Sequence, residues 1–209
     1  MEKKLLLWDL DYTLGNFDCI VCELGDMILP DGAPIKIQVR EHIHETLQEL
    51  SKDYFSVITT RSSKTYAQIA LERSGLYSYF ENVYTKEQLC DNITALKNYC
   101  VVFEDFGYSQ DMAKEQAIII GDMFSDRCDC VRGVSFIHQK DGHLLPAHNI
   151  VTLLSLLEKK NPLNFNNAIS QLYLEGSKTH DSAFSIYKSD TLRCFIDKEY
   201  ARIFNIQIS

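Results

Sequence analysis

Five short apolar runs alternate along this chain with longer segments in which apolar residues recur at helical spacing. The runs cover residues 4–8, 55–59, 82–85, 117–120 and 134–137. Runs of this length that are bounded by turn residues are typical of strands buried on both faces. Strands that alternate with helices predict an α/β fold, in which a Rossmann-like parallel sheet carries helices on both of its faces.

The segments between the runs supply the crossover helices. We expect helices over residues 37–51, 63–74, 96–106 and 150–158. Residues 15–34 contain several glycines and prolines, so that we expect a loop or a small hairpin there. The alternation of strand and helix is therefore predicted to extend almost to residue 160.

The length of 209 residues suits one α/β domain with a small addition. We expect residues 1–160 to form the core domain, because Asn161 and Pro162 end the last predicted helix. Residues 161–209 are expected to form a strand-rich C-terminal appendage, since residues 202–208 alternate with period two. This appendage would extend a sheet edge, cover part of the domain, or join two copies of the chain in a homo-oligomer.

Charge and composition exclude some partners. The net charge is −8 and no cluster of Lys and Arg is found, which argues against binding of a nucleic-acid backbone. No apolar stretch approaches the roughly 18 residues of a membrane-spanning helix, so we expect no membrane partner. The seven scattered cysteines fit a reducing compartment, and we expect a cytoplasmic protein.

Polar side chains stand where three of the predicted strands end. Asp9 and Asp11 follow the first run, Thr59 and Thr60 end the second, and Asp122 and Asp126 follow the fourth. The carboxyl ends of parallel strands meet at one edge of a sheet, which is where such folds bind ligands. We therefore expect these six side chains to lie close together.

Several carboxylates at one edge require a cation. Two carboxylates about 4 Å apart repel each other by roughly 4 kcal/mol at an effective dielectric constant of 20. A divalent ion that prefers oxygen ligands relieves this repulsion, and Mg²⁺ combines well with a few carboxylates, phosphate and water. The sequence therefore predicts a Mg²⁺ cofactor together with a nearby lysine.

The order of these motifs resembles that of the haloacid dehalogenase-like hydrolase superfamily. Residues 9–13 match its D-x-D-x-T signature, and residues 121–126 match its G-D-x-x-x-D motif. Thr59 resembles the second motif, a Ser or Thr at a strand end, with Thr60 as the alternative position. The resemblance covers about residues 4–155.

The third motif of the superfamily is a single lysine, and several lysines of this chain compete for it. Lys97 has the expected order and spacing, because it precedes a helix that leads into the run at 117–120. Lys86 and Lys114 are the alternatives. We select Lys97.

The resemblance implies a phosphatase of the type with little or no cap, and a role for each residue. Asp9 would be the nucleophile that forms an aspartyl-phosphate, and Asp11 would be the general acid and base. Thr59, Thr60 and Lys97 would bind the substrate phosphate. The Mg²⁺ ligands would be Asp9, Asp11, Asp122 and Asp126.

The resemblance also implies an open site, because neither usual cap position contains a large insertion. In this superfamily, open sites often serve bulky substrates such as phosphoproteins or nucleic-acid ends, or are covered by another subunit. We expect a phosphorylated small molecule or a phosphoprotein as substrate. Two other functions fit the same residues. One is a non-catalytic interaction protein that reuses the fold, and the other is a phosphotransferase that passes the phosphoryl group to an acceptor other than water.

Overall fold

The computed structural model describes most of the chain up to residue 121 and parts of the remainder. The described residues are 3–25, 36–90, 97–121 and 133–135, together with 147, 151, 154, 155, 158, 159, 161, 163 and 167. The predicted helix at 150–158 and the predicted appendage at 161–209 therefore lie, apart from isolated residues, outside the described part.

A parallel sheet of five described strands forms the centre of the molecule, in the order β5-β4-β1-β6-β7. The strands are β1 (Lys4–Trp8), β4 (Tyr54–Thr59), β5 (Asn82–Tyr84), β6 (Ala117–Gly121) and β7 (Gly133–Ser135). All four pairings are parallel. Each strand overlaps one of the predicted runs, so the predicted parallel sheet is confirmed.

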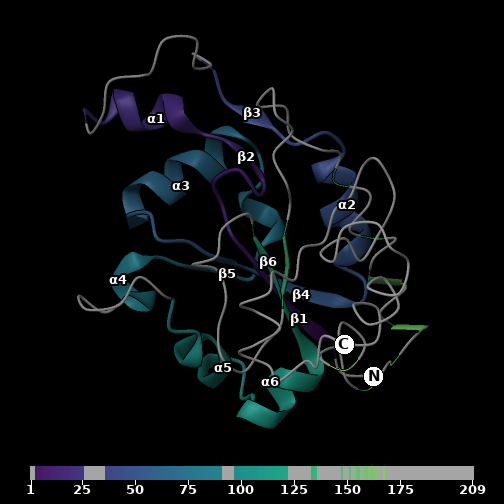
Figure 1. Ribbon diagram of the computed structural model, residues 1–209. Helices are drawn as coiled ribbons and strands as arrows, with labels where there is room; N and C mark the ends of the chain where they lie inside the picture. Colours follow the sequence, from purple (N-terminus) through teal and green to yellow (C-terminus); the bar gives the residue numbers. More distant parts are fainter. Residues whose placement is uncertain are drawn as a thin grey trace, which may run out of the picture.

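Helices pack on both faces of the sheet (Figure 1). One face carries α1 (Asp18–Glu23), α2 (Ile43–Leu50) and α3 (Lys64–Arg73), and the other carries α5 (Cys100–Asp105) and α6 (Gln110–Gln116). A 3-10 helix η1 (Tyr77–Tyr79) and the short helix α4 (Lys86–Leu89) flank β5. This three-layer arrangement confirms the Rossmann-like fold class.

Alternation of side chains along β1 divides the apolar core into two. Leu6 and Trp8 pack into the cluster under α2 and α3, whereas Leu5 and Leu7 pack into the cluster under α5 and α6. Successive side chains of a strand point to opposite faces, which is why one strand supplies both clusters. Burial of each such side chain stabilises the fold by about 1.5–3 kcal/mol.

The helix predicted over residues 37–51 is wrong at its beginning. α2 starts only at Ile43, and β3 (Gln38–Val39) instead pairs antiparallel with β2 (Gly15–Asn16). A Cβ atom at Gly15 would lie 2.5 Å from the Gln38 carbonyl oxygen, so the absent side chain is what allows this approach. The expected small hairpin between residues 15 and 34 thus takes its second strand from further along the chain.

Other element bounds also differ from the prediction. The helix expected over residues 96–106 covers only 100–105, which leaves Lys97 in the connection before it. The short helices α1, α4 and α6 were not predicted, because six, four and seven residues give too little periodic pattern. None of the described helices has the length and apolar character that crossing a bilayer requires.

Candidate functional site

The candidate site lies at the carboxyl edge of the sheet, where β1, β4 and β6 end side by side. Asp9 follows Trp8, the last residue of β1, and its backbone N–H donates to the Ile120 carbonyl of β6 at 2.8 Å. Thr59 is the last residue of β4, which pairs with β1 on the other side. The central strand therefore projects Asp9 between its two neighbours.

A buried lysine contacts Asp9. The Lys97 Nζ atom donates to Asp9 Oδ1 at 2.6 Å and to the Thr59 carbonyl oxygen at 2.6 Å. The side chain of Lys97 is 1% exposed and that of Asp9 is 11% exposed, so the pair is shielded from water. The ammonium group thus links the ends of β1 and β4.

The other two candidate lysines lie elsewhere. Lys86 begins α4 and is exposed. Lys114 pairs with Asp111 at 3.0 Å on the surface of α6. Of the three candidates, Lys97 is the lysine that the structure brings to Asp9.

Two hydroxyl groups donate to the carboxylate of Asp11. Tyr66 Oη donates to Asp11 Oδ1 at 2.5 Å, and Ser62 Oγ donates to Asp11 Oδ2 at 3.0 Å. Burial, followed by the negative charge of Asp11, raises the pKa of Tyr66 well above its usual value of 10.0. The phenol therefore stays protonated and donates throughout the ordinary pH range.

A buried arginine fixes the backbone of the loop between Asp11 and β2. Arg40 is 1% exposed, and its Nε donates to the Thr13 carbonyl at 2.7 Å while Nη2 donates to the Tyr12 carbonyl at 2.5 Å. Tyr12 has a φ of 56°, a left-handed conformation that side chains other than glycine rarely adopt. Charged hydrogen bonds to two successive carbonyls hold this strained turn in place.

Sequence reasoning missed Arg40, Ser62 and Tyr66. Arg40 fell in a segment predicted to be helical, where an arginine is normally exposed. Tyr66 lies in α3 and Ser62 lies just before the helix. No local pattern distinguishes these residues from other polar residues near a helix start.

The two candidate threonines use their hydroxyl groups differently. Thr59 Oγ1 donates to the Trp8 carbonyl at 3.3 Å, inside the sheet. Thr60 Oγ1 instead accepts the Ser62 N–H at 3.1 Å, which leaves its own proton available for donation. Thr13 Oγ1 is buried and has no hydrogen-bond partner among the described residues.

The predicted metal ligands are only partly within the described residues. Asp9 and Asp11 lie at the site, whereas Asp122 and Asp126 lie outside the described residues. Gly121, which directly precedes Asp122 in the sequence, ends β6 beside β1. No cluster of three or more His, Cys, Asp and Glu is found within the described part. The carboxylate of Asp9 and the backbone carbonyl of Asp11 nevertheless offer the oxygen ligands that Mg²⁺ prefers, so the donor set fits this ion.

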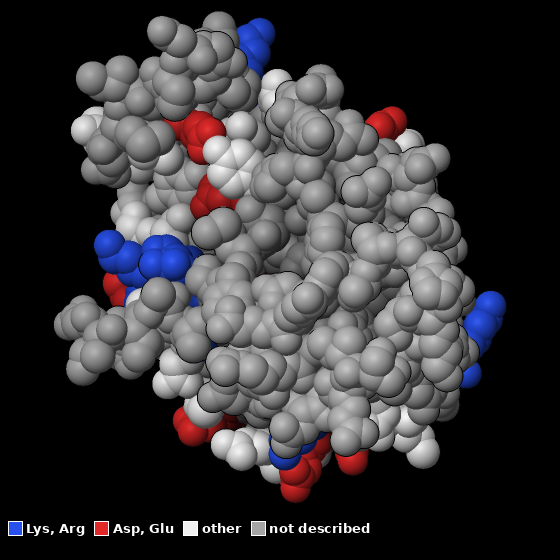
Figure 2. Space-filling view, viewed as in Figure 1, with Lys and Arg blue, Asp and Glu red and all other residues white. Residues whose placement is uncertain are grey.

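Basic side chains gather beside the site, although the net charge of the chain is −8. Three basic residues are exposed here: Arg61, Lys64 and Lys86. The backbone N–H of Lys86 donates to the Ser62 carbonyl at 3.1 Å, which holds the start of α4 next to the connection after β4. Figure 2 shows blue side chains together in the region that α3 and α4 occupy in Figure 1. A local concentration of positive charge of this kind favours the approach of an anion.

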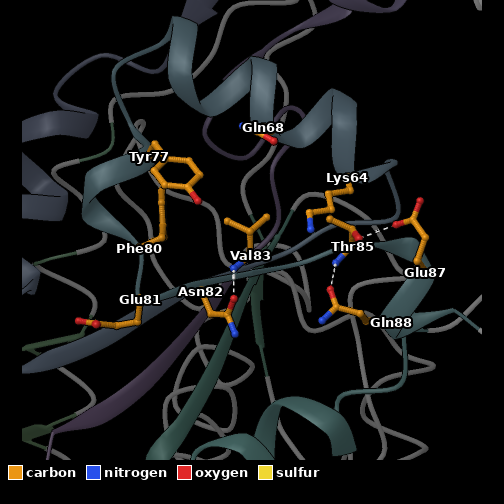
Figure 3. A pocket seen from close by; sticks show the side chains of 10 residues that line it. All are labelled: Lys64, Gln68, Tyr77, Phe80, Glu81, Asn82, Val83, Thr85, Glu87 and Gln88. Atoms are coloured by element: carbon orange, nitrogen blue, oxygen red, sulfur yellow. Dashed lines mark hydrogen bonds between the residues drawn. The ribbon is translucent and has the colours of Figure 1, made fainter.

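A separate pocket of about 480 Å³ lies between α3, η1 and the edge strand β5. Figure 3 shows Lys64 and Gln68 of α3 on one side of it and Val83 and Thr85 on the other. β5 is the outermost of the described strands on this side of the sheet, and the Val83 N–H donates to the side chain of Asn82 at 2.8 Å. None of the predicted site residues that the structure describes lines this pocket, so it is distinct from the candidate site.

The sequence and the fold both match known proteins. A model of the NLI interacting factor-like phosphatase family matches residues 4–131, which include β1, β4, β5 and β6. No curated protein matches the chain.

Solved structures show the same fold. A HAD-superfamily hydrolase of subfamily IA from Geobacter sulfurreducens is 17% identical, with a TM-score of 0.53 over 73% of this chain and 100% of that one. The HAD-hydrolase YfnB from Bacillus subtilis, described as bound to magnesium, is 13% identical, with a TM-score of 0.52 over 74% and 100% of the two chains. A HAD-superfamily hydrolase from Ehrlichia chaffeensis is 11% identical, with a TM-score of 0.50 over 74% and 97%.

Proposed function

Because the chain belongs to the NLI interacting factor-like phosphatase family and is a phosphatase with a haloacid dehalogenase-like fold, we propose that it hydrolyses phosphate monoesters through a covalent phosphate on Asp9. One observation carries this proposal: the Lys97 ammonium lies 2.6 Å from Asp9 Oδ1 at the carboxyl edge of the sheet. A carboxylate next to a fixed cation can approach a phosphate dianion, because the cation offsets the repulsion between the two anions.

The first half of the reaction transfers the phosphoryl group to the protein. A carboxylate oxygen of Asp9 forms a bond to phosphorus while the bond from phosphorus to the ester oxygen breaks. Asp11 gives its proton to the departing oxygen, so that an alcohol leaves rather than an alkoxide. Lys97 and the Thr60 hydroxyl hold the phosphoryl oxygens during the transfer.

The second half regenerates the carboxylate. Asp11, now deprotonated, accepts a proton from a water molecule, whose oxygen attacks the phosphorus of the aspartyl-phosphate. The bond from phosphorus to the Asp9 oxygen breaks, which releases inorganic phosphate and restores both side chains. We assign the hydroxyl contact to Thr60 rather than Thr59, because the Thr59 proton is already donated to the Trp8 carbonyl.

The donor set supports Mg²⁺ as the cofactor. Asp9, the backbone carbonyl of Asp11, Asp122 and Asp126 would hold the ion, as the motif order implies. When bound, Mg²⁺ would neutralise charge shared between the nucleophile and the phosphoryl oxygens. Proton transfer is performed by Asp11, and Lys97 and Thr60 supply the hydrogen bonds to the phosphoryl oxygens.

A direct test uses p-nitrophenyl phosphate as the substrate. We expect turnover in the presence of Mg²⁺, loss of turnover with EDTA, and loss of turnover in the Asp9→Asn variant. Intact-protein mass spectrometry after acid quenching should detect a phosphoryl adduct on the wild type and none on Asp9→Asn. The exposed Asp111 serves as the matched control, and Asp111→Asn should retain wild-type turnover.

Two outcomes would reject the mechanism. Turnover that survives in Asp9→Asn would exclude this carboxylate as the nucleophile. Transfer to added alcohols in preference to water would identify a phosphotransferase instead of a hydrolase.

A further inference from the structure

Both oxygens of the Asp11 carboxylate accept a hydrogen bond from outside its own loop. Tyr66 reaches Oδ1 at 2.5 Å from α3, and Ser62 reaches Oδ2 at 3.0 Å from the connection after β4. Rotation of the carboxylate about its Cβ–Cγ bond would break both hydrogen bonds together. The two donors therefore define the plane of the group.

The Tyr66 donor is itself fixed in position. Tyr66 is 6% exposed and packs in the apolar cluster beneath α3. The helix begins beside it, where the Ser63 side chain accepts the Tyr66 N–H at 3.4 Å. A rigid ring that ends in a single hydroxyl transmits the position of α3 to Asp11.

We propose that Tyr66 and Ser62 are positioning residues that hold the Asp11 carboxyl group in the orientation from which it protonates the departing oxygen. This inference rests on the proposed function, in which Asp11 is the general acid. Neither residue needs to touch the substrate. Their effect passes through Asp11, so it depends on how much the departing oxygen needs a proton.

This dependence separates a positioning role from a structural one. A p-nitrophenolate ion leaves readily without a proton, whereas an alkoxide does not, and general acid catalysis typically contributes about 10²–10⁴-fold to such a step. A misplaced general acid thus costs most with poor leaving groups. We expect Tyr66→Phe to lower kcat/KM for ethyl phosphate by roughly tenfold to a hundredfold, and kcat/KM for p-nitrophenyl phosphate by roughly threefold or less.

The experiment measures kcat/KM across a series of substituted phenyl phosphates and ethyl phosphate. The variants are Tyr66→Phe and Ser62→Ala, with thermal melting to establish that each is folded. Tyr54→Phe is the matched control: Tyr54 is 7% exposed in the same apolar cluster and donates to Glu158 Oε1 at 3.1 Å, but lies at the amino end of β4. We expect the control to retain the wild-type dependence on the leaving group.

A steeper dependence of kcat/KM on leaving-group pKa in both Tyr66→Phe and Ser62→Ala supports the proposal. If the same substitutions cause no further steepening when they are made in Asp11→Asn, that result adds to the support. An equal loss across all substrates in Tyr66→Phe and in Ser62→Ala overturns it, and so does no loss with any substrate. The proposed function fails differently, because wild-type protein would then turn over none of these esters. If Tyr66→Phe does not fold, Ser62→Ala decides the question by the same two criteria.

Discussion

Removal of the Lys97 ammonium is the perturbation that tests the site most severely. The Lys97→Met variant keeps an unbranched side chain of similar length but loses the charge that lies 2.6 Å from Asp9. Breaking a buried ion pair by removing one partner typically costs about 3–5 kcal/mol. The side chains are 1% and 11% exposed, so water screens little of this interaction.

The expected loss is large enough for thermal melting. For a chain of this size, 1 kcal/mol shifts Tm by roughly 2–4 °C, so the variant should melt about 6–20 °C lower than the wild type. The measurement requires EDTA, because Mg²⁺ would partly replace the missing positive charge. Turnover of p-nitrophenyl phosphate with Mg²⁺ present should fall by about 10²–10³-fold, as when one preorganised donor is removed from an active site.

Two comparisons make this reasoning refutable. Lys114→Met removes a lysine that is 44% exposed and paired with Asp111, and should cost no more than about 1 kcal/mol. In the double variant Lys97→Met/Asp9→Asn, the carboxylate that needed the cation is gone, and much of the lost stability should return. If Lys97→Met melts no lower than Lys114→Met, or if the double variant recovers nothing, the buried pair does not have the role that its geometry indicates.

Three further predictions follow from the described contacts. Thr60→Val should lower turnover of p-nitrophenyl phosphate by at least tenfold, since a lost hydrogen bond to a charged group costs about 1.5–3 kcal/mol. Thr59→Val should lower this turnover less. Equal losses in the two variants would contradict our choice between the two hydroxyls. Arg40→Met should reduce the free energy of unfolding in urea by several kcal/mol, because the buried Thr13 carbonyl and the part-buried Tyr12 carbonyl each lose a charged donor worth about 1.5–3 kcal/mol. A loss below about 1 kcal/mol would exclude Arg40 as the support of the turn. Burial and the hydrogen bond to Asp105 raise the pKa of Tyr84 from 10.0 to about 12. The unfolded chain therefore releases this proton first, so the stability that Tyr84 contributes is present below pH 10 and lost as pH rises towards 12. Urea unfolding at several alkaline pH values should show a steeper loss of stability in the wild type than in Tyr84→Phe, which keeps the loss caused by the raised pKa of Tyr66.

Local sequence pattern was sufficient for the sheet and for part of the site. Each strand is a short apolar run, and a run is recognisable without knowledge of its neighbours. The rule that ligands bind at the carboxyl ends of parallel strands then indicated Asp9, Asp11 and the two threonines. The family match over residues 4–131 agrees with the resemblance that the same motifs suggested.

Pattern failed where long-range pairing overrides local periodicity. The spacing of apolar residues from 37 onwards resembled a helix, but residues 38 and 39 pair with a strand at 15 and 16. A backbone that is already hydrogen-bonded to a distant strand cannot also form helical bonds. The start of α2 was therefore decided by tertiary structure rather than by its own sequence.

The sequence by itself determined the order of strands and helices and the acidic residues at the strand ends, because both depend on residues that are close together along the chain. The order and spacing of the motifs selected Lys97, but only the tertiary structure brings its ammonium group to Asp9, which lies 88 positions away along the chain. It also decided that Arg40 supports the loop and that Tyr66 and Ser62 hold Asp11. Such contacts depend on strand register and on how each helix packs against the sheet, and neither is encoded in the spacing of nearby residues.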